Sequence, residues 1–265
     1  MKAFLSSITL GAVIVMILLG PILLSADPMA TDAEAQFQPP NARHPLGTDL
    51  LGRDVLSRLV YGGRQTLLIT VMATLVATSL GALIGSVAGF VKATWLNRVV
   101  MVVVNAMLAI PGLVIALVVL TLTGRGILPM ILALSLSQIA PVALVIRSAV
   151  QTVRHAGYIE AAVSMGARPL TTLWRHVLPN IRPTLFSYVC VIFSYVLLNG
   201  AALSFLGVGN EPGTPDWGVM LAEGRAAFRS APWVSFAPGV AITVTVWAVN
   251  DLANQILLSN KRTVR

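Results

Sequence analysis

Long uncharged stretches separated by short polar segments dominate the sequence. Six stretches contain no Asp, Glu, Lys or Arg, namely residues 3–26, 65–91, 99–124, 126–146, 183–210 and 230–250. The shortest of them has 21 residues, and about 20 apolar residues cross the hydrocarbon core of a bilayer as an α-helix. Lipid offers no hydrogen-bond partner to an open backbone, so the spans must be helical. The pattern predicts an all-α membrane protein with six transmembrane helices.

The charged residues are distributed unevenly between the two sides of this predicted bundle. If the N-terminus lies inside, the inner segments hold 11 of the 18 Lys and Arg residues with two acids, and the outer segments hold the other 7 with 8 acids. Because inner loops of membrane proteins are enriched in Lys and Arg, this distribution favours both termini inside. The excess of Lys and Arg in the inner segments then accounts for the net charge of +8. No basic domain lies outside the spans, which argues against a nucleic-acid partner.

The first stretch, residues 1–26, also has features of a cleaved signal peptide. Lys2 precedes an apolar run, and Leu24-Ser25-Ala26 resembles a cleavage site. The run over residues 8–24 has 17 residues, whereas the apolar part of a signal peptide has about 7–15. We therefore predict a retained first transmembrane helix. Cleavage would leave five spans and an external N-terminus.

The polar segments divide the rest of the chain. Residues 27–65 are external, and within them residues 49–61 show the two faces of an amphipathic helix lying in the membrane interface. Asp54 and Arg58 are four residues apart there, which suits an ion pair, and Gly62-Gly63 predicts the end of this helix. Residues 66–258 form the core, with five spans and a cytoplasmic loop over 148–182. Residues 259–265 form a cytoplasmic tail.

The second span carries small residues at every fourth position. They are Ala73, Ala77, Gly81, Gly85 and Gly89. Small residues on one face allow two helices to approach closely in lipid, so we expect this face to pack against another span.

Polar and helix-breaking residues within the later spans mark a candidate pore or gate. They are Asn105, Pro111, Gln138, Pro141 and Asn199. Proline kinks a helix, and kinks and buried amides are expected beside a translocation path but also at ordinary packing contacts. Both interpretations stay open. No ionised side chain lies deep in a predicted span, which disfavours a proton- or ion-coupled carrier.

The cytoplasmic loop predicts two short helices joined by a glycine. Residues 158–165 have helical composition, and Glu160 suits the first turn of a helix. Gly166 can adopt the left-handed conformation that ends a helix, Pro169 suits the start of a second one, and Pro179 predicts its end. Helices this short are unstable alone in water, so we expect them to dock on a partner. Ala161 and Ala162 leave room for that partner's side chains, and Arg154, Arg168 and Arg175 either pair with its acids or face lipid headgroups.

The last external loop, residues 207–229, is rich in Gly and Pro and long for a plain connector. Asp216-Trp217-Gly218 predicts the start of a short helix over 219–228. The loop suits a cap on the pore or a contact with a delivery protein, for which Asp216, Trp217 and Glu223 are the candidate residues. A plain connector and attraction of a peptide amino group by Asp216 and Glu223 are the alternatives.

Motifs for catalysis and nucleotide binding are missing from the sequence. It has no GxxxxGK[ST] phosphate loop, so this chain does not bind ATP by that route. It has no catalytic dyad and no TVGYG-type filter. His44, His155 and His176 show no metal-ligand spacing, so no metal site and no enzymatic activity are predicted.

Three segments resemble one known family. Glu160-Ala161-Ala162, Gly166 and His176-Val177-Leu178-Pro179 resemble the EAA loop of permease subunits of bacterial ABC importers. The general pattern has isoleucine at the place of His176, and histidine there is usual in the dipeptide, oligopeptide and nickel branch. Residues 44–58 resemble the external N-terminal signature of that branch, and residues 206–221 resemble its last external loop. The resemblance covers roughly residues 44–258.

The resemblance implies a type I importer permease in the bacterial cytoplasmic (inner) membrane. Its expected partners are a second homologous permease subunit, two ATP-binding subunits that hold ATP and Mg²⁺, and an external solute-binding protein. The EAA-loop residues would dock on the ATPases: Glu160 as a polar anchor, Gly166 as the bend, and Leu178-Pro179 as the hinge. This chain would form half of a pore for short peptides and bind no cofactor itself.

Other functions stay open at this stage. Within the family, the solute is a short peptide or, alternatively, a nickel complex, glutathione or another small solute. From other classes, an ATP-independent carrier or channel and a membrane scaffold are the alternatives. The ATP dependence of uptake separates the carrier from the importer.

Overall fold

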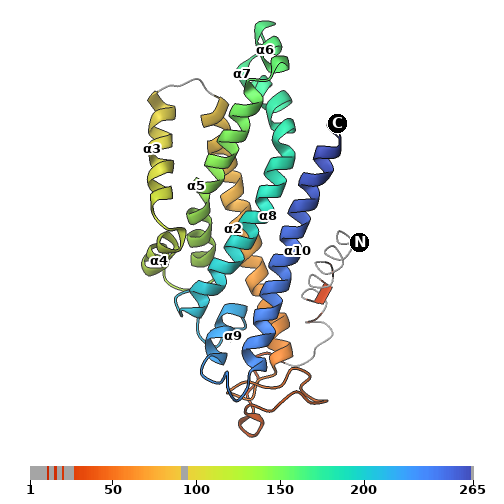
Figure 1. Cartoon of the computed structure of the whole chain (residues 1–265). Coiled ribbons are helices and arrows are strands. Elements are labelled where there is room, and N and C mark those ends of the chain that lie inside the picture. Colours follow the sequence, from red (N-terminus) through yellow and green to blue (C-terminus); the bar gives the residue numbers. More distant parts are fainter. Residues whose placement is uncertain (1–10, 12–14, 17–19, 21–26, 91–94, 264–265) are drawn as a thin grey trace.

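The computed structural model describes residues 11, 15–16, 20, 27–90 and 95–263 of the chain, and in this part it is almost entirely helical (Figure 1). A short 3-10 helix, Ala33–Ala35, lies in the external segment. The longer elements are α2 (Val55–Phe90), α3 (Trp95–Ala109), α4 (Gly112–Thr123), α5 (Ile127–Arg154), α6 (Gly157–Ser164), α7 (Pro169–Thr172), the π-helix η2 (Leu173–Val177), α8 (Leu178–Phe205), α9 (Trp217–Gly224) and α10 (Trp233–Thr263).

Four helices are long and apolar enough to cross a membrane. They are α2, α5, the continuous helix over Leu173–Phe205, and α10 over Trp233–Ile256. Asn97–Ala109 and Gly112–Thr123 meet at 92° and form either a fifth, broken span or a re-entrant loop. Pro111 lies at this break in an extended conformation, where it offers no N–H to a helix. The all-α membrane fold is confirmed, with four or five spans in the described part; the first predicted span, residues 3–26, falls almost wholly outside the described residues.

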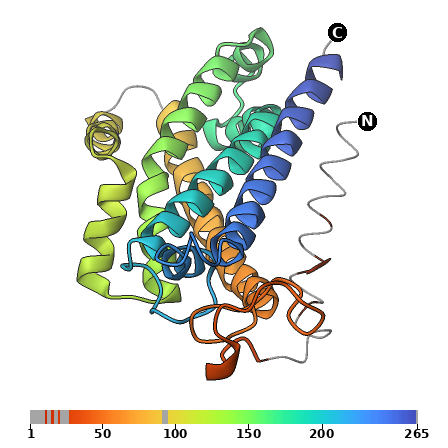
Figure 2. The same ribbon diagram turned by 60° about the horizontal axis from the view of Figure 1, so that its bottom comes forward.

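The two ends of the bundle have different contents. α6, α7 and the C-terminal end of α10 lie at one end, and residues 27–54 and α9 lie at the other (Figure 1). Seen from below, α3 and α4 stand at one side of the bundle and α10 at the opposite side (Figure 2). The described membrane-spanning helices therefore alternate in direction along the bundle (Figure 1).

The row of small residues on α2 packs against α5, as the sequence predicts. Ala73 and Ala77 are fully buried. A Cβ atom added at Gly81 would lie 2.8 Å from the Ile139 carbonyl oxygen, and one at Gly85 would overlap the carbonyl oxygen of Ala143. The backbones of α2 and α5 thus lie too close together for a residue larger than glycine at these two positions.

Two predicted helix ends are wrong. α2 begins at Val55 and passes through Gly62-Gly63 without a break, so there is no separate interfacial helix over 49–61. Gly62 serves a close contact instead, since a Cβ there would lie 3.0 Å from the backbone nitrogen of Asp216. Pro179 likewise does not end a helix: it lies in the first turn of α8, where a missing N–H is tolerated.

The π-helix before Pro179 explains how the helix continues. In this wider turn the Leu178 N–H donates to the Leu173 carbonyl oxygen, five residues earlier. The extra residue in the turn accommodates a proline that would otherwise clash with the carbonyl four residues before it. As a result the inner loop runs directly into a membrane-spanning helix.

Candidate functional site

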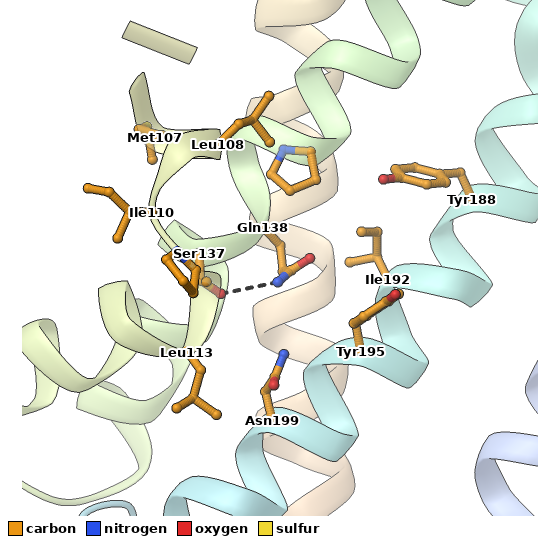
Figure 3. A pocket seen from close by; sticks show the side chains of 13 residues that line it. Met107, Leu108, Ile110, Leu113, Ser137, Gln138, Tyr188, Ile192, Tyr195 and Asn199 are labelled. Carbon is orange, nitrogen blue, oxygen red and sulfur yellow. Dashed lines mark hydrogen bonds between the residues drawn. The ribbon is translucent and has the colours of Figure 1, made fainter. Parts of the chain in front are cut away.

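A cavity of about 510 Å³ lies where α3 bends into α4, in the middle of the membrane-spanning region. The bend, α5 and α8 each contribute one wall (Figure 3). The lining residues are Met107, Leu108, Ile110, Pro111, Gly112, Leu113, Ser137, Gln138, Pro141, Tyr188, Ile192, Tyr195 and Asn199. We call this the bend cavity.

Four of the five predicted pore residues meet in the bend cavity. Pro111 comes from the bend, Gln138 and Pro141 from α5, and Asn199 from α8. Asn105 is not among the lining residues and lies exposed on α3. The structure thus brings together side chains from three segments that are 27 to 88 residues apart in the sequence.

Sequence reasoning missed the two tyrosines of the cavity. Tyr188, Ile192, Tyr195 and Asn199 follow one another at the spacing that places residues on one face of an α-helix. Extending the face of Asn199 back along α8 would have found them. Tyr195 keeps 58% of its surface exposed although it lies in a membrane-spanning helix.

The bend cavity offers hydrogen-bonding groups without charge. Gln138 Nε2 donates to Ser137 Oγ at 3.3 Å, and Ser137 Oγ donates to the Leu134 carbonyl at 2.8 Å. Pro141 has no N–H for the Ser137 carbonyl. Gln138 and Asn199 point into the hollow from facing helices (Figure 3). Among the described residues that line it, none is Asp, Glu, Lys or Arg, so the cavity suits a polar solute rich in amide groups.

The inner loop forms the second candidate site. α6 ends before Gly166, whose φ of +86° confirms the predicted left-handed turn. Ile159, Thr172 and Leu173 are buried and anchor the loop on the bundle.

The predicted coupling residues lie on both sides of this turn. Ala161, Gly166, Arg168 and Arg175 are exposed, whereas Arg154, His176, Leu178 and Pro179 are half-buried. Glu160 and Ala162 belong to α6, but their side chains lie outside what the structure describes.

Large apolar side chains project from the inner loop, and sequence reasoning overlooked them. Met165 is 83% exposed, and Tyr158 and Trp174 are also exposed. Apolar side chains exposed together on a polar segment mark a contact surface for another protein. The sequence does contain a signal for this surface, because these large apolar residues stand in an otherwise basic loop.

Three buried charged residues and the half-buried Glu223 tie the outer end together. Asp49 Oδ2 accepts from Arg53 Nε at 2.7 Å and from Arg58 Nη1 at 2.6 Å. Glu223 Oε2 accepts from Arg53 Nη2 at 2.9 Å and from Arg58 Nη1 at 2.6 Å. We call these four residues the outer cluster. Two cations and two anions balance, and Arg58 is only 1% exposed.

The outer cluster corrects two predictions. Asp54 does not pair with Arg58; it accepts from His44 at 3.0 Å. The predicted polar face of residues 49–61 does not face solvent either, because the last external loop covers Arg53 and Arg58. A sequence pattern identifies a polar face but not the segment that covers it.

The three predicted contact residues of that loop have internal partners. Asp216 caps α9 by accepting from the N–H groups of Gly218 and Val219, and its second oxygen accepts from Thr66 Oγ1 at 2.8 Å. Trp217 is fully buried and donates to the Leu59 carbonyl. Glu223 bonds both arginines of the outer cluster. Asp216 and Trp217 are buried and hold the loop in place, and the contact of this loop with a delivery protein stays a prediction.

α9 starts at Trp217, close to the start that the sequence predicts for a helix over residues 219–228. It ends at Gly224, before the predicted end at residue 228.

Comparison with known proteins agrees with the resemblance of the three motifs. Residues 81–262 match the family model described as the binding-protein-dependent transport system inner membrane component. The chain is 38% identical over 232 residues to a probable peptide ABC transporter permease protein of Sinorhizobium fredii, covering 88% of this chain and 79% of that one. It is 35% identical to the di/tripeptide transport system permease protein DppC of Pseudomonas aeruginosa (88% and 78% covered). It is 34% identical to the glutathione transport system permease protein GsiD of Pectobacterium atrosepticum (85% and 77% covered).

A solved structure has the same fold. A chain of the MetNI methionine ABC transporter, in an inward-facing conformation, superimposes with a TM-score of 0.67 at 19% identity, covering 76% of this chain and 95% of that one. Together with the family match, this fold identifies a multi-pass membrane protein. The chain belongs to the family of inner membrane components of binding-protein-dependent transport systems, as an ABC importer permease subunit.

Proposed function

We propose that this chain forms half of the translocation pore of an ATP-driven importer for short peptides. One observation carries the proposal: a single helix over Leu173–Phe205 links the exposed inner loop to Tyr188, Tyr195 and Asn199 in the bend cavity. A movement imposed on the inner loop therefore reaches a wall of the cavity along one continuous helix. The names of the relatives in Sinorhizobium and Pseudomonas support peptides as the solute.

Two ATP-binding subunits supply the energy in this proposal. They hold ATP and Mg²⁺, and one of them grips α6 and α7 through the exposed side chains of the inner loop. ATP binding closes the ATPase pair, draws the inner loops of the two permeases together and opens the pore outward. Hydrolysis resets the inward-facing state. This chain holds no cofactor and catalyses no reaction itself.

A second homologous permease completes the pore. Asn105 and Tyr195 expose polar groups on membrane-spanning helices, and lipid cannot satisfy such groups. A second permease that faces α3 and α8 would cover them and close the open side of the bend cavity. An external solute-binding protein would deliver the solute from the outer end.

Glutathione is the second candidate solute. A glutathione permease of Pectobacterium covers this chain almost as fully as the peptide permeases do, and glutathione is itself a small peptide. The neutral lining of the bend cavity suits the amide groups of both solutes.

Gly166→Val is expected to uncouple ATP hydrolysis from transport. Valine at φ +86° costs about 1–2 kcal/mol relative to its preferred conformations, so the angle between α6 and α7 shifts. Nothing lies within 4 Å of the added Cβ, and the effect is therefore one of backbone conformation. Uptake should fall while ATP hydrolysis by the complex continues, measured side by side in the same proteoliposomes.

Gly157→Val is the matched control. Gly157 is exposed in the same loop, has no positive φ and has no atoms near its Cβ, so this variant should transport normally. Normal uptake by fully expressed Gly166→Val protein would contradict the assigned role of the turn.

Isolation of the tagged chain from its native membrane in mild detergent tests the proposed assembly. Mass spectrometry should find a second permease and one or two ATPases in stoichiometric amounts. Recovery of the chain alone, under conditions that preserve another ABC complex, would count against the proposal.

A further inference from the structure

We infer that the turn over residues 49–52, the outer turn, is a contact surface for the external solute-binding protein, held in position by the outer cluster. The inference rests on the proposed function, because it requires an importer with such a partner. Leu50 and Leu51 form the apolar edge of this turn, and they are 55% and 45% exposed. Asp216 and Trp217, the residues first considered for this contact, are buried behind it.

Local hydrogen bonds fix the shape of the outer turn. Asp49 Oδ1 accepts from the Leu51 N–H at 2.9 Å and from the Arg53 N–H at 3.0 Å, and the Gly52 N–H donates to the Asp49 carbonyl at 3.1 Å. Gly52 has a φ of +70°, and a Cβ there would overlap the carbonyl oxygen of Asp32. The turn is therefore packed tightly on residues 27–37 and needs glycine at this position.

The outer cluster then fixes the turn on the rest of the protein. The same Asp49 carboxylate that shapes the turn also accepts from Arg53 and Arg58 through its second oxygen. Both arginines continue to Glu223, and both donate to the Gly213 carbonyl. The outer turn and the loop over residues 213–223 therefore form one rigid unit.

This unit lies at the outer ends of α2 and α10, where Trp233 Nε1 donates to the Thr48 carbonyl at 3.1 Å. α2 has 36 residues, a length of about 54 Å, against a hydrocarbon core of about 30 Å. The uncharged stretch of α2 starts only at Gln65, so residues 55–64 add about 15 Å of helix on the outer side. The outer turn directly precedes Val55, at the outer end of that extension.

Charge also favours a soluble protein over the lipid surface as the occupant. Asp32 donates its backbone N–H to the Leu51 carbonyl, which places it beside the turn, and Glu34 follows two residues later. Both acids are exposed, and anionic headgroups would repel them. The four charges of the outer cluster pair with one another, which leaves the leucines as the contact groups.

The expected partner surface is an apolar recess at the rim of the binding protein. A rigid turn loses little conformational freedom on binding, so apolar side chains held this way contribute strongly to affinity. The unit also contacts the helix that lines the bend cavity, because Gly218 of α9 packs on the Ala201 carbonyl of α8, two residues after Asn199.

The test uses the complete transporter in nanodiscs and the soluble binding protein that stimulates its ATPase activity. The double variant Leu50→Asp with Leu51→Asp should weaken binding of the fluorescently labelled binding protein by at least about tenfold, as expected for loss of a central contact. Both side chains are exposed, so folding, subunit composition and basal ATPase activity should not change.

The double variant Ala30→Asp with Ala42→Asp is the matched control, since both residues are exposed in the same external segment and together receive the same two charges. It should bind the labelled protein like the wild type. Unchanged affinity of the double variant, the result expected if the leucines instead touch lipid, would overturn the inference, and so would equal losses in both variants. A wild-type complex that contains no ATPase and responds to no binding protein would overturn the proposed function itself.

Discussion

Replacing Arg58 with methionine is expected to destabilise the protein by about 3–5 kcal/mol, the cost of removing one partner from a buried ion pair. Arg58 donates to Asp49 and Glu223, both at 2.6 Å, and to the Gly213 carbonyl at 3.2 Å. Methionine fills much of the space but leaves two carboxylates with one arginine. The outer end should therefore separate from α2, and the purified protein should lose thermal stability in detergent.

Arg64→Met serves as the control, because Arg64 is exposed on the same helix. Its effect should stay within about 0.5 kcal/mol. Adding Glu223→Gln to Arg58→Met removes the excess negative charge and leaves Asp49 paired with Arg53 at 2.7 Å. This double variant should be more stable than Arg58→Met alone. Equal stability of the double and single variants would show that charge balance is not what holds the cluster.

Replacing Tyr158 and Met165 with aspartate is expected to abolish docking of the ATPase. Both side chains are exposed on the inner loop, at the end of the bundle opposite to the outer cluster (Figure 1). Large apolar residues at the centre of an interface contribute about 2 kcal/mol or more each, a roughly thirtyfold loss of affinity. The permease should insert and fold normally, but the yield of co-purified ATPase should fall steeply.

Ser148→Asp with Thr152→Asp controls for the two added charges, because both residues are exposed at the inner end of α5, outside α6. The two preparations should be compared by size-exclusion chromatography and by the ratio of ATPase to permease. An undiminished ratio in the aspartate variant of Tyr158 and Met165 would remove these side chains from the coupling surface.

Much of the fold follows from sequence because its causes are local. The uncharged stretches identify the spans, since each is long enough to cross a bilayer, and the Lys and Arg distribution gives their direction. The left-handed turn at Gly166 and the start of α9 behind Asp216 also follow from single residues. Each of these features depends on neighbours within one or two helical turns.

The features that sequence reasoning missed depend on distant contacts. Gly62 looks like a helix end, but the backbone of Asp216, 154 residues away, occupies the space of its side chain. Arg53 and Arg58 look like a solvent-facing row, but their acceptor Glu223 comes from the last external loop. Pro179 looks like a stop, and only the preceding π-turn shows how the helix continues.

The bend cavity could be predicted from the sequence only in part. Its prolines and amides stand out in an apolar sequence, so Pro111, Gln138, Pro141 and Asn199 could be found. Tyr188 and Tyr195 do not stand out by residue type, and they follow only when the helix face of Asn199 is extended back along α8. The exposure of Met165 also depends on how α6 packs on the bundle, which the sequence alone does not show.

Reconstituted uptake tests the central claim most directly. The complex that contains this chain is placed in proteoliposomes with a labelled dipeptide and the binding protein on the outer side of the permease and ATP with Mg²⁺ on the inner side. We predict accumulation of the dipeptide only when ATP, Mg²⁺ and the binding protein are all present. Uptake that proceeds without ATP, driven by an ion gradient or by the dipeptide gradient alone, would contradict the importer and identify a carrier or channel.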